Sequence, residues 1–349
     1  MISYLILFGI FALIALFSLA TLGKDQPMVI FISIAALLIV TAGFRDGTAF
    51  RDYSIYELMY TNYQKISLLA FEPTFILLSA IVKYVFFDKV IVLFVLYGII
   101  GVSVKFCAIR QLSQFYYLSV LFYFSNYFLL HEMTQIRAGV AAGFLLLCIK
   151  PIYNRDFASF FFFNLLAFLF HYSAIIFLPF YFLLPKKMDS LVYVLLLIGT
   201  YLLHFVNIHA TTIFYLIPAE NLQFKLESYK NLVEFSLQEK LNVFKPLQVA
   251  RIGLCLFLLW KKDLIFEQNK YAFILLKIYF IAVFAIPLFA DIPTFAIRSS
   301  ELLGVVEIIM LPMAIYAIKE TKIVALATVA LCFAFLCVNF FYTKLIVFK

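Results

Sequence analysis

The chain has 349 residues, of which 66% are hydrophobic and 13% are charged, and its net charge is +8. A soluble globular domain is about half apolar and about one quarter charged, so this composition excludes a soluble protein with an ordinary core. The basic residues stand in short loops between apolar runs, which the positive-inside rule explains more simply than binding to nucleic acid does. The sequence therefore predicts a protein that crosses a membrane several times.

Apolar runs of the length of a membrane-spanning helix follow one another along the chain. Such a helix needs about 20 apolar residues, and fewer where it is tilted or packed among other helices. The sequence predicts an all-α, polytopic transmembrane helix bundle of about 11 to 14 spans, which forms one membrane domain over residues 1–349. The candidate spans are residues 2–22, 28–44, 73–87, 90–108, 115–130, 138–150, 157–170, 172–185, 190–208, 247–260, 270–289, 301–318 and 323–343.

Two polar segments interrupt these runs, residues 45–72 and residues 209–246. The first has the spacing of an amphipathic helix at a membrane interface. The second sets four lysines against four glutamates, so it has no positive bias. We expect both to be polar loops with amphipathic helices on the periplasmic side of the membrane.

Basic residues in the other loops predict how the chain crosses the membrane, because cytoplasmic loops are enriched in Lys and Arg. They place residues 131–137, His171 and residues 290–300 on the side opposite to the cytoplasm. Counting the spans back from Lys105 places residues 45–72 in the cytoplasm. Either one of the first apolar segments does not cross the membrane fully, or residues 45–72 do not have the periplasmic role that we expect. The basic loops contain Lys105/Arg110, Lys150/Arg155, Lys186/Lys187, Lys261/Lys262 and Lys319/Lys322.

Two arginines stand where an apolar run begins on the outer side, Arg137 in "QIRAGVA" and Arg298 in "AIRSSELLG". A guanidinium beside the positive end of a helix suits a phosphate or pyrophosphate, which arginine binds through two parallel hydrogen bonds. The alternative is an interfacial arginine that extends toward lipid headgroups. Because both arginines lie on one side without an excess of positive charge around them, we favour a pyrophosphate site.

Three further residues are candidates for proton transfer. Asp52 lies in the polar stretch "FRDGTAFRDYSIYELMY", where an acid gains little at a lipid surface. Glu72 precedes a proline that can begin a helix, so it is either a helix cap or a functional acid. His171 follows a largely apolar run, which fits either a hydrogen-bonded core histidine or a base. The sequence does not rank the three.

No motif for a metal or a nucleotide is present. The chain has no HExxH pair, no Walker A loop, no GxGxxG turn and no DxD, and its His and acidic residues are too scattered to predict a metal site. The five cysteines all lie in apolar runs, where small buried side chains are common. We expect neither a metal nor a cofactor.

Taken in chain order, these segments resemble the EpsG-type family of bacterial polysaccharide polymerases, a branch of the Wzy-like enzymes. The resemblance covers nearly the whole chain, and it depends on five short motifs in the order of the family. The motifs are "RDYSIY" with Asp52, Tyr53 and Tyr56, "FEPTF" with Glu72, "QIRAGVA" with Arg137, "HYSAIIFLP" with His171, Ser173 and Pro179, and "RSSELLGVVEIIMLP" with Arg298, Glu307 and Pro312.

The resemblance implies a fold like that of the membrane-embedded C-type glycosyltransferases. It also implies an activity at the bacterial inner membrane, where repeat units carried on undecaprenyl pyrophosphate are joined on the periplasmic face into O-antigen, capsule or exopolysaccharide. The growing chain leaves its lipid pyrophosphate and moves to the non-reducing end of the incoming unit. The implied partners are the lipid-linked oligosaccharide, membrane lipids and a chain-length regulator.

Each candidate residue has a chemical role in such a reaction. Arg137 and Arg298 would stabilise the departing pyrophosphate, as a metal does in other enzymes. Asp52, Glu72 or His171 would take the proton of the acceptor hydroxyl. Sugars also stack on aromatic side chains. The candidate sugar-binding residues are Tyr53, Tyr56 and Tyr229.

Other membrane functions fit part of this pattern. A flippase or transporter for the same lipid-linked sugars would carry polar residues through the bundle and often has inverted repeats and broken helices. Here the polar residues gather on one side, no repeat is visible and the chain has only 11 glycines. An O-antigen ligase, a membrane O-acetyltransferase and a purely structural membrane protein are the further alternatives.

Overall fold

The computed structural model describes residues 2–22, 27–47, 49–50, 52–64, 71–208, 210–211, 227, 241–318, 321–343 and 345–346. Over these residues the secondary structure is helical, and one isolated antiparallel bridge joins Phe50 and Ile346. The prediction of an all-α protein is confirmed. Most of the polar segment 209–246 lies outside the described residues.

The chain divides into two compact units, residues 1–183 with 307–349 and residues 184–306. Among the described polar residues that the motifs single out by number, the first unit contains all except Arg298. Its helices are α1 (Ile2–Ala20), α2 (Met28–Gly43), α3 (Tyr53–Asn62), α4 (Pro73–Val85), α5 (Val90–Leu112), α6 (Tyr116–Phe122), η1 (Tyr123–Phe128), α7 (Leu129–His131), α8 (Ile136–Leu147), α9 (Ile149–Asn154), α10 (Phe157–Phe170), η2 (Tyr172–Phe182), α18 (Glu307–Met313), η3 (Ala314–Ala317), α19 (Thr321–Cys337) and η4 (Val338–Tyr342).

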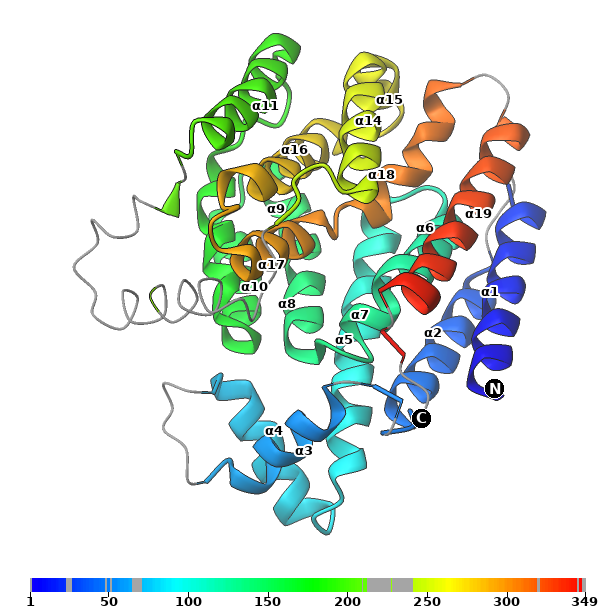
Figure 1. Cartoon of the computed structure of the whole chain (residues 1–349). Coiled ribbons are helices and arrows are strands. Elements are labelled where there is room, and N and C mark those ends of the chain that lie inside the picture. Colours follow the sequence, from blue (N-terminus) through cyan, green and yellow to red (C-terminus); the bar gives the residue numbers. More distant parts are fainter. Residues whose placement is uncertain are drawn as a thin grey trace. The chain divides into compact units, whose positions relative to one another are not determined.

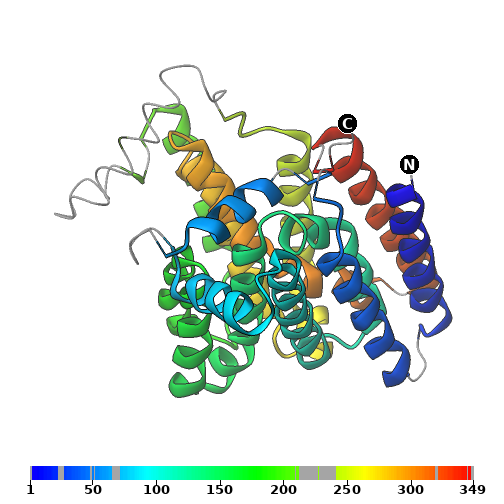
Figure 2. The same cartoon turned by 90° about the horizontal axis from the view of Figure 1, so that it is seen from below.

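Helix α5 is central in the first unit, because α2, α4 and α8 all pack against it (Figure 1). Helix α10 packs on the other side of α8, and η2 folds back along α10. The first helix, α1, lies against α6 and beside α19, so the two ends of the chain meet in this unit (Figures 1 and 2). This packing brings α3, α4, α8 and the α10–η2 junction within reach of one another.

The second unit is built around helix α16, whose side chains are buried on nearly all sides. Helices α11, α14, α15 and α17 pack against it. A helix that is apolar all round is typical of the interior of a bundle. The helices of this unit are α11 (Ser190–Phe205), α14 (Pro246–Trp260), α15 (Lys262–Gln268), α16 (Ala272–Leu288) and α17 (Pro293–Gly304).

Within the described part of the chain, three helical stretches are long and apolar enough to cross a membrane by themselves. They are Val90–Leu112, Ile136–Asn154 and Thr321–Tyr342. The other predicted spans correspond mainly to shorter apolar helices of 10–17 residues. Outer helices such as α1 and α11 expose leucines and other large apolar side chains, which suit a lipid environment. The chain is therefore a multi-pass membrane protein.

Candidate functional site

Glu72 lies immediately before α4, where segments that are distant in sequence meet. Pro73 occupies the first position of α4, where the N–H that proline lacks would have no partner within the helix. The Glu72 side chain does not bond to an N–H of α4, so it does not act as a side-chain cap. It is only 5% exposed, and a buried carboxylate requires partners elsewhere.

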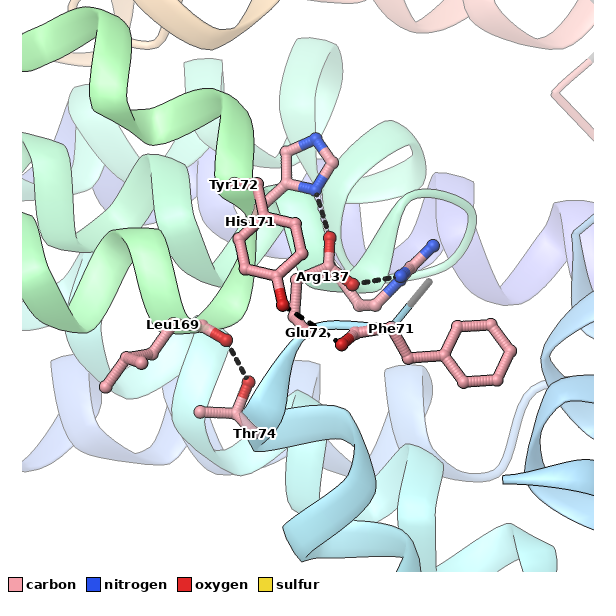
Figure 3. A network of polar contacts seen from close by, with 7 residues as sticks. All are labelled: Phe71, Glu72, Thr74, Arg137, Leu169, His171 and Tyr172. Carbon is pink, nitrogen blue, oxygen red and sulfur yellow. Dashed lines mark hydrogen bonds and ion pairs between the residues drawn. The ribbon is translucent and has the colours of Figure 1, made fainter. Parts of the chain in front are cut away.

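Two basic side chains supply those partners (Figure 3). Arg137 Nη1 forms an ion pair with Oε2 of Glu72, and Nδ1 of His171 lies 2.9 Å from Oε1. Arg137 is the second residue of α8, which confirms its predicted place at a helix start, and His171 stands between α10 and η2. One carboxylate thus joins three separate elements.

Neighbouring hydrogen bonds fix the backbone on both sides of this contact (Figure 3). The Tyr172 hydroxyl donates to the carbonyl oxygen of Phe71 at 3.1 Å. The Thr74 hydroxyl donates to the carbonyl oxygen of Leu169 at 2.7 Å. Because these bonds flank Glu72 and His171, the two side chains are held at their separation by backbone contacts as well as by their own bond.

The charge of this cluster follows from its contacts. Burial raises the pKa of the Glu72 carboxyl, but the hydrogen bond from His171 and the positive charge of Arg137 outweigh this effect and hold the pKa below its ordinary value. Glu72 is therefore ionised at neutral pH. An ionised carboxylate only accepts hydrogen bonds, so Nδ1 of His171 carries the proton, and Nε2 of the neutral ring is the atom that can accept one.

Arg137 lies over an aromatic surface. Its Cζ atom is 5.6 Å from the ring centroid of Tyr56 and 5.7 Å from that of Phe75. Aromatic rings attract a guanidinium in this arrangement. The Arg137 side chain remains 20% exposed, and its Nε has no hydrogen-bond acceptor among the described residues. Arg137 is thus held in place while it keeps capacity for an anion.

The remaining predicted residues of the segment 45–72 lie on or next to α3. Tyr56 is 6% exposed and its ring packs against Phe75, so in this arrangement it supports Arg137. Tyr53 is half-buried and stacks on Phe94 with ring centroids 4.4 Å apart. Asp52 is half-buried at the start of α3, and neither ion pair of Glu72 involves it.

Arg298 and Tyr229 are not part of the described cluster. Helix α17 begins at Pro293, so Arg298 is its sixth residue and is exposed. The prediction that Arg298 stands at the start of a helix is therefore wrong, because the proline begins the helix earlier. Tyr229 lies outside the described residues.

A second polar cluster in the same unit was not found from the sequence. Lys105 is fully buried in α5, with its Nζ 2.5 Å from Oε1 of Glu132 and 2.7 Å from the carbonyl oxygen of Gly139. The Tyr123 hydroxyl donates to the same Glu132 oxygen at 2.9 Å. The assignment of Lys105 to a cytoplasmic loop is therefore wrong, because its charge is neutralised inside the bundle. A lysine within an apolar run was the available signal.

Two glycines allow this second cluster to form. A Cβ atom at Gly101 would overlap Oε2 of Glu132, and one at Gly139 would overlap the carbonyl oxygen of His131. The backbones of α5 and α8 can approach the turn that contains His131 and Glu132 only because both positions lack a side chain. Since α8 begins directly after this turn, the cluster also fixes the position of Arg137 at the start of α8.

Comparison with known proteins identifies the family. Among the described residues, no group of three or more His, Cys, Asp and Glu side chains is arranged to hold a metal. No curated protein and no solved structure matches the chain. The model of the EpsG family matches residues 28–348, a range that contains both polar clusters. The chain therefore belongs to the EpsG family, which supports a role of the polysaccharide-polymerase kind.

Proposed function

We propose that this protein is a glycosyltransferase that joins undecaprenyl-pyrophosphate-linked oligosaccharide repeat units into a surface polysaccharide on the periplasmic face of the inner membrane. The single observation that supports this most is the ionised Glu72 between Arg137 and His171. It combines a cation suited to a diphosphate with a carboxylate–histidine pair suited to a hydroxyl proton.

The reaction forms one bond and breaks one. The oxygen of an acceptor hydroxyl attacks the anomeric carbon of the donor sugar, and the bond from that carbon to the diphosphate oxygen breaks. The bonding electrons leave with the lipid diphosphate, and the proton of the hydroxyl passes to a base. The products are a longer oligosaccharide on its lipid carrier and a released lipid diphosphate.

In this reaction His171 is the base and Glu72 is its positioning residue. The bond between Nδ1–H and Oε1 of Glu72 selects the tautomer in which Nε2 accepts the hydroxyl proton. The negative charge of Glu72 also stabilises the imidazolium that forms. Removal of such an orienting carboxylate leaves the ring in place but weakens its ability to act as a base.

Arg137 stabilises the leaving group. Negative charge develops on the diphosphate as the sugar departs, and a guanidinium held at a helix start meets that charge without reorganising. The Nε of Arg137 is buried and has no acceptor in the described part of the chain, so a phosphate oxygen that reached it would complete its hydrogen bonding. Arg298, in the second unit, is proposed as a further cation for the substrate, Tyr53 and Tyr229 are proposed sugar contacts, and Asp52 is a further candidate acid.

A complementation experiment tests the proposal. A strain that lacks the gene receives wild type, Arg137→Ala or Arg110→Ala, and its surface polysaccharide is separated on a gel. Arg110 is the matched control because it is an exposed arginine of α5 in the same unit. We expect a ladder of chain lengths with wild type and Arg110→Ala, and a single repeat unit with Arg137→Ala at equal protein level.

Two results would contradict the proposal. A full ladder with Arg137→Ala would show that polymerisation does not require Arg137. Loss of even the single repeat unit in the deletion strain would indicate a flippase or a ligase, because a polymerase acts after the first unit has crossed the membrane and is not needed for its display.

A further inference from the structure

Arg45 is a buried guanidinium close to the end of α2. The residue is 7% exposed, and its Nη1 donates to the carbonyl oxygen of Ala42 at 3.0 Å and to that of Glu132 at 2.7 Å. Both acceptors are neutral backbone groups, so the side chain is anchored without losing its charge. Arg45 therefore has a fixed position and an undiminished positive charge.

The Nε–Nη2 edge of this guanidinium has no hydrogen-bond acceptor among the described residues. Both nitrogens are buried. These two nitrogens form the side of the group that binds two oxygens of a phosphate or carboxylate through parallel hydrogen bonds. Arg45 makes no ion pair within the described ranges, and the nearby Glu132 carboxylate is already bonded to Lys105 and Tyr123.

The balance of buried charges also indicates that Arg45 lacks a counter-charge. The two polar clusters and Arg45 together contain three cations, Arg45, Lys105 and Arg137, and two carboxylates, Glu72 and Glu132. Burial lowers the pKa of Arg45 to about 10, so its guanidinium still carries its charge at neutral pH. A buried charge without a counter-charge is unfavourable, and an anion is the group that would compensate it.

Arg45 and Arg137 border one aromatic cluster. The Cζ atom of Arg45 lies 4.1 Å from the ring centroid of Phe94, and Tyr56 packs edge-on against Phe94 with centroids 6.4 Å apart. Arg137 lies over the same Tyr56 ring. The Tyr56 side chain is within electrostatic range of both guanidinium groups. The unfilled donors of Arg45 therefore belong to the surroundings of the Glu72 site.

We propose that Arg45 is a further anion-binding residue, whose Nε–Nη2 edge binds two oxygens of a phosphate group on the lipid-linked substrate. The identity of the phosphate carrier rests on the proposed function, whereas the anion-binding edge rests on the contacts of Arg45 alone. Both nitrogens are covered in the described conformation, so a neighbouring side chain moves aside when the phosphate binds.

Binding measurements test this proposal. The full chain is purified, placed in phosphatidylcholine nanodiscs, and titrated separately with undecaprenyl pyrophosphate and with inorganic pyrophosphate. Arg45→Lys keeps the positive charge but cannot present two parallel N–H groups, and Arg110→Lys is the exposed control. We expect Arg45→Lys to weaken the binding of undecaprenyl pyrophosphate about tenfold or more, and Arg110→Lys to leave it unchanged.

The two titrations and the lipid composition of the nanodiscs together show whether the bound phosphate belongs to the lipid-linked substrate or to a membrane headgroup. Weaker binding of the lipid-borne probe supports the proposal, whether or not inorganic pyrophosphate follows it. Unchanged binding of both probes by Arg45→Lys overturns it. An effect of Arg45→Lys that appears only in nanodiscs containing phosphatidylglycerol also overturns it, because the occupant is then a membrane headgroup.

A second measurement covers the case in which Arg45→Lys does not fold. A protein with Arg137→Gln and Arg298→Gln keeps Arg45, and we expect undecaprenyl pyrophosphate still to raise its melting temperature, since a ligand stabilises the state that binds it. No residual stabilisation would overturn the proposal. Binding that depends on Arg45 in a protein without polymerase activity would contradict the proposed function alone, and normal polymerisation with unchanged Arg45→Lys binding would contradict this inference alone.

Discussion

Nδ1 of His171 lies 2.9 Å from Oε1 of Glu72, although the two residues are 99 positions apart in the chain. The second oxygen of Glu72 forms an ion pair with Arg137, which comes from a third element. A single carboxylate therefore sets the tautomer of a histidine and the place of an arginine.

Glu72→Gln should reduce activity strongly while the protein stays folded. The amide has nearly the same size, but it removes the charge that pairs with Arg137. It also replaces one of the two oxygens that accept from Arg137 and His171 with a donor NH2, so it cannot present a separate accepting oxygen to each. We expect the rate of polymerisation to fall about 100-fold or more, as measured with lipid-linked repeat units in nanodiscs. Glu57→Gln, an exposed acid of α3, is the control and should keep the wild-type rate.

The contacts of Glu72 with Arg137 and His171 should also make the stability of the protein depend on pH. Burial opposes the charge on Glu72, but its partners hold its pKa below the ordinary value. The contribution of such a group is present above the unfolded-state pKa, about 4.3, and is lost as the pH falls through the folded-state pKa. Wild type should melt above Glu72→Gln at pH 7, and the difference should shrink on acidification below about pH 4.3. A difference that grows on acidification would contradict this sign.

Lys105 and Glu132 should behave as one unit in unfolding experiments. Lys105→Met or Glu132→Gln alone leaves a buried charge without its partner, and the expected loss of stability is about 3–5 kcal/mol. The double variant removes both charges, so its loss should be smaller than the sum of the two. Denaturant unfolding in detergent micelles measures all three variants. Additive losses would show that the pair is not coupled.

Gly101 offers a test of the close approach between α5 and Glu132. Gly101→Ala places a methyl group against Oε2 of Glu132, so the carboxylate or the helix must shift. We expect a loss of about 1–3 kcal/mol, measured by thermal unfolding in micelles. Gly9→Ala in α1 is the matched control, because nothing lies within 4 Å of its added Cβ. Equal effects of both substitutions would place the Glu132 side chain elsewhere.

The class of fold and much of the helix order are predictable from local sequence signals. Composition and the succession of apolar runs predicted an all-α membrane protein, and the predicted runs 28–44, 157–170 and 270–289 correspond closely to α2, α10 and α16. The sequence also placed Glu72 before a helix that begins with proline and Arg137 at the start of α8. These features are local, because hydropathy and helix-start signals depend on neighbouring residues.

Which polar residues meet depends on the packing of helices that are distant in sequence. Glu72 could have been a cap and His171 an isolated core histidine until the packing of α4, α8 and the α10–η2 junction joined them. The pattern of basic loops assigns Lys105 to a loop, because its burial depends on Glu132 from a later turn and on the glycine at position 101. Pairing of buried charges is a property of contacts between distant segments, and no local pattern in the sequence contains it.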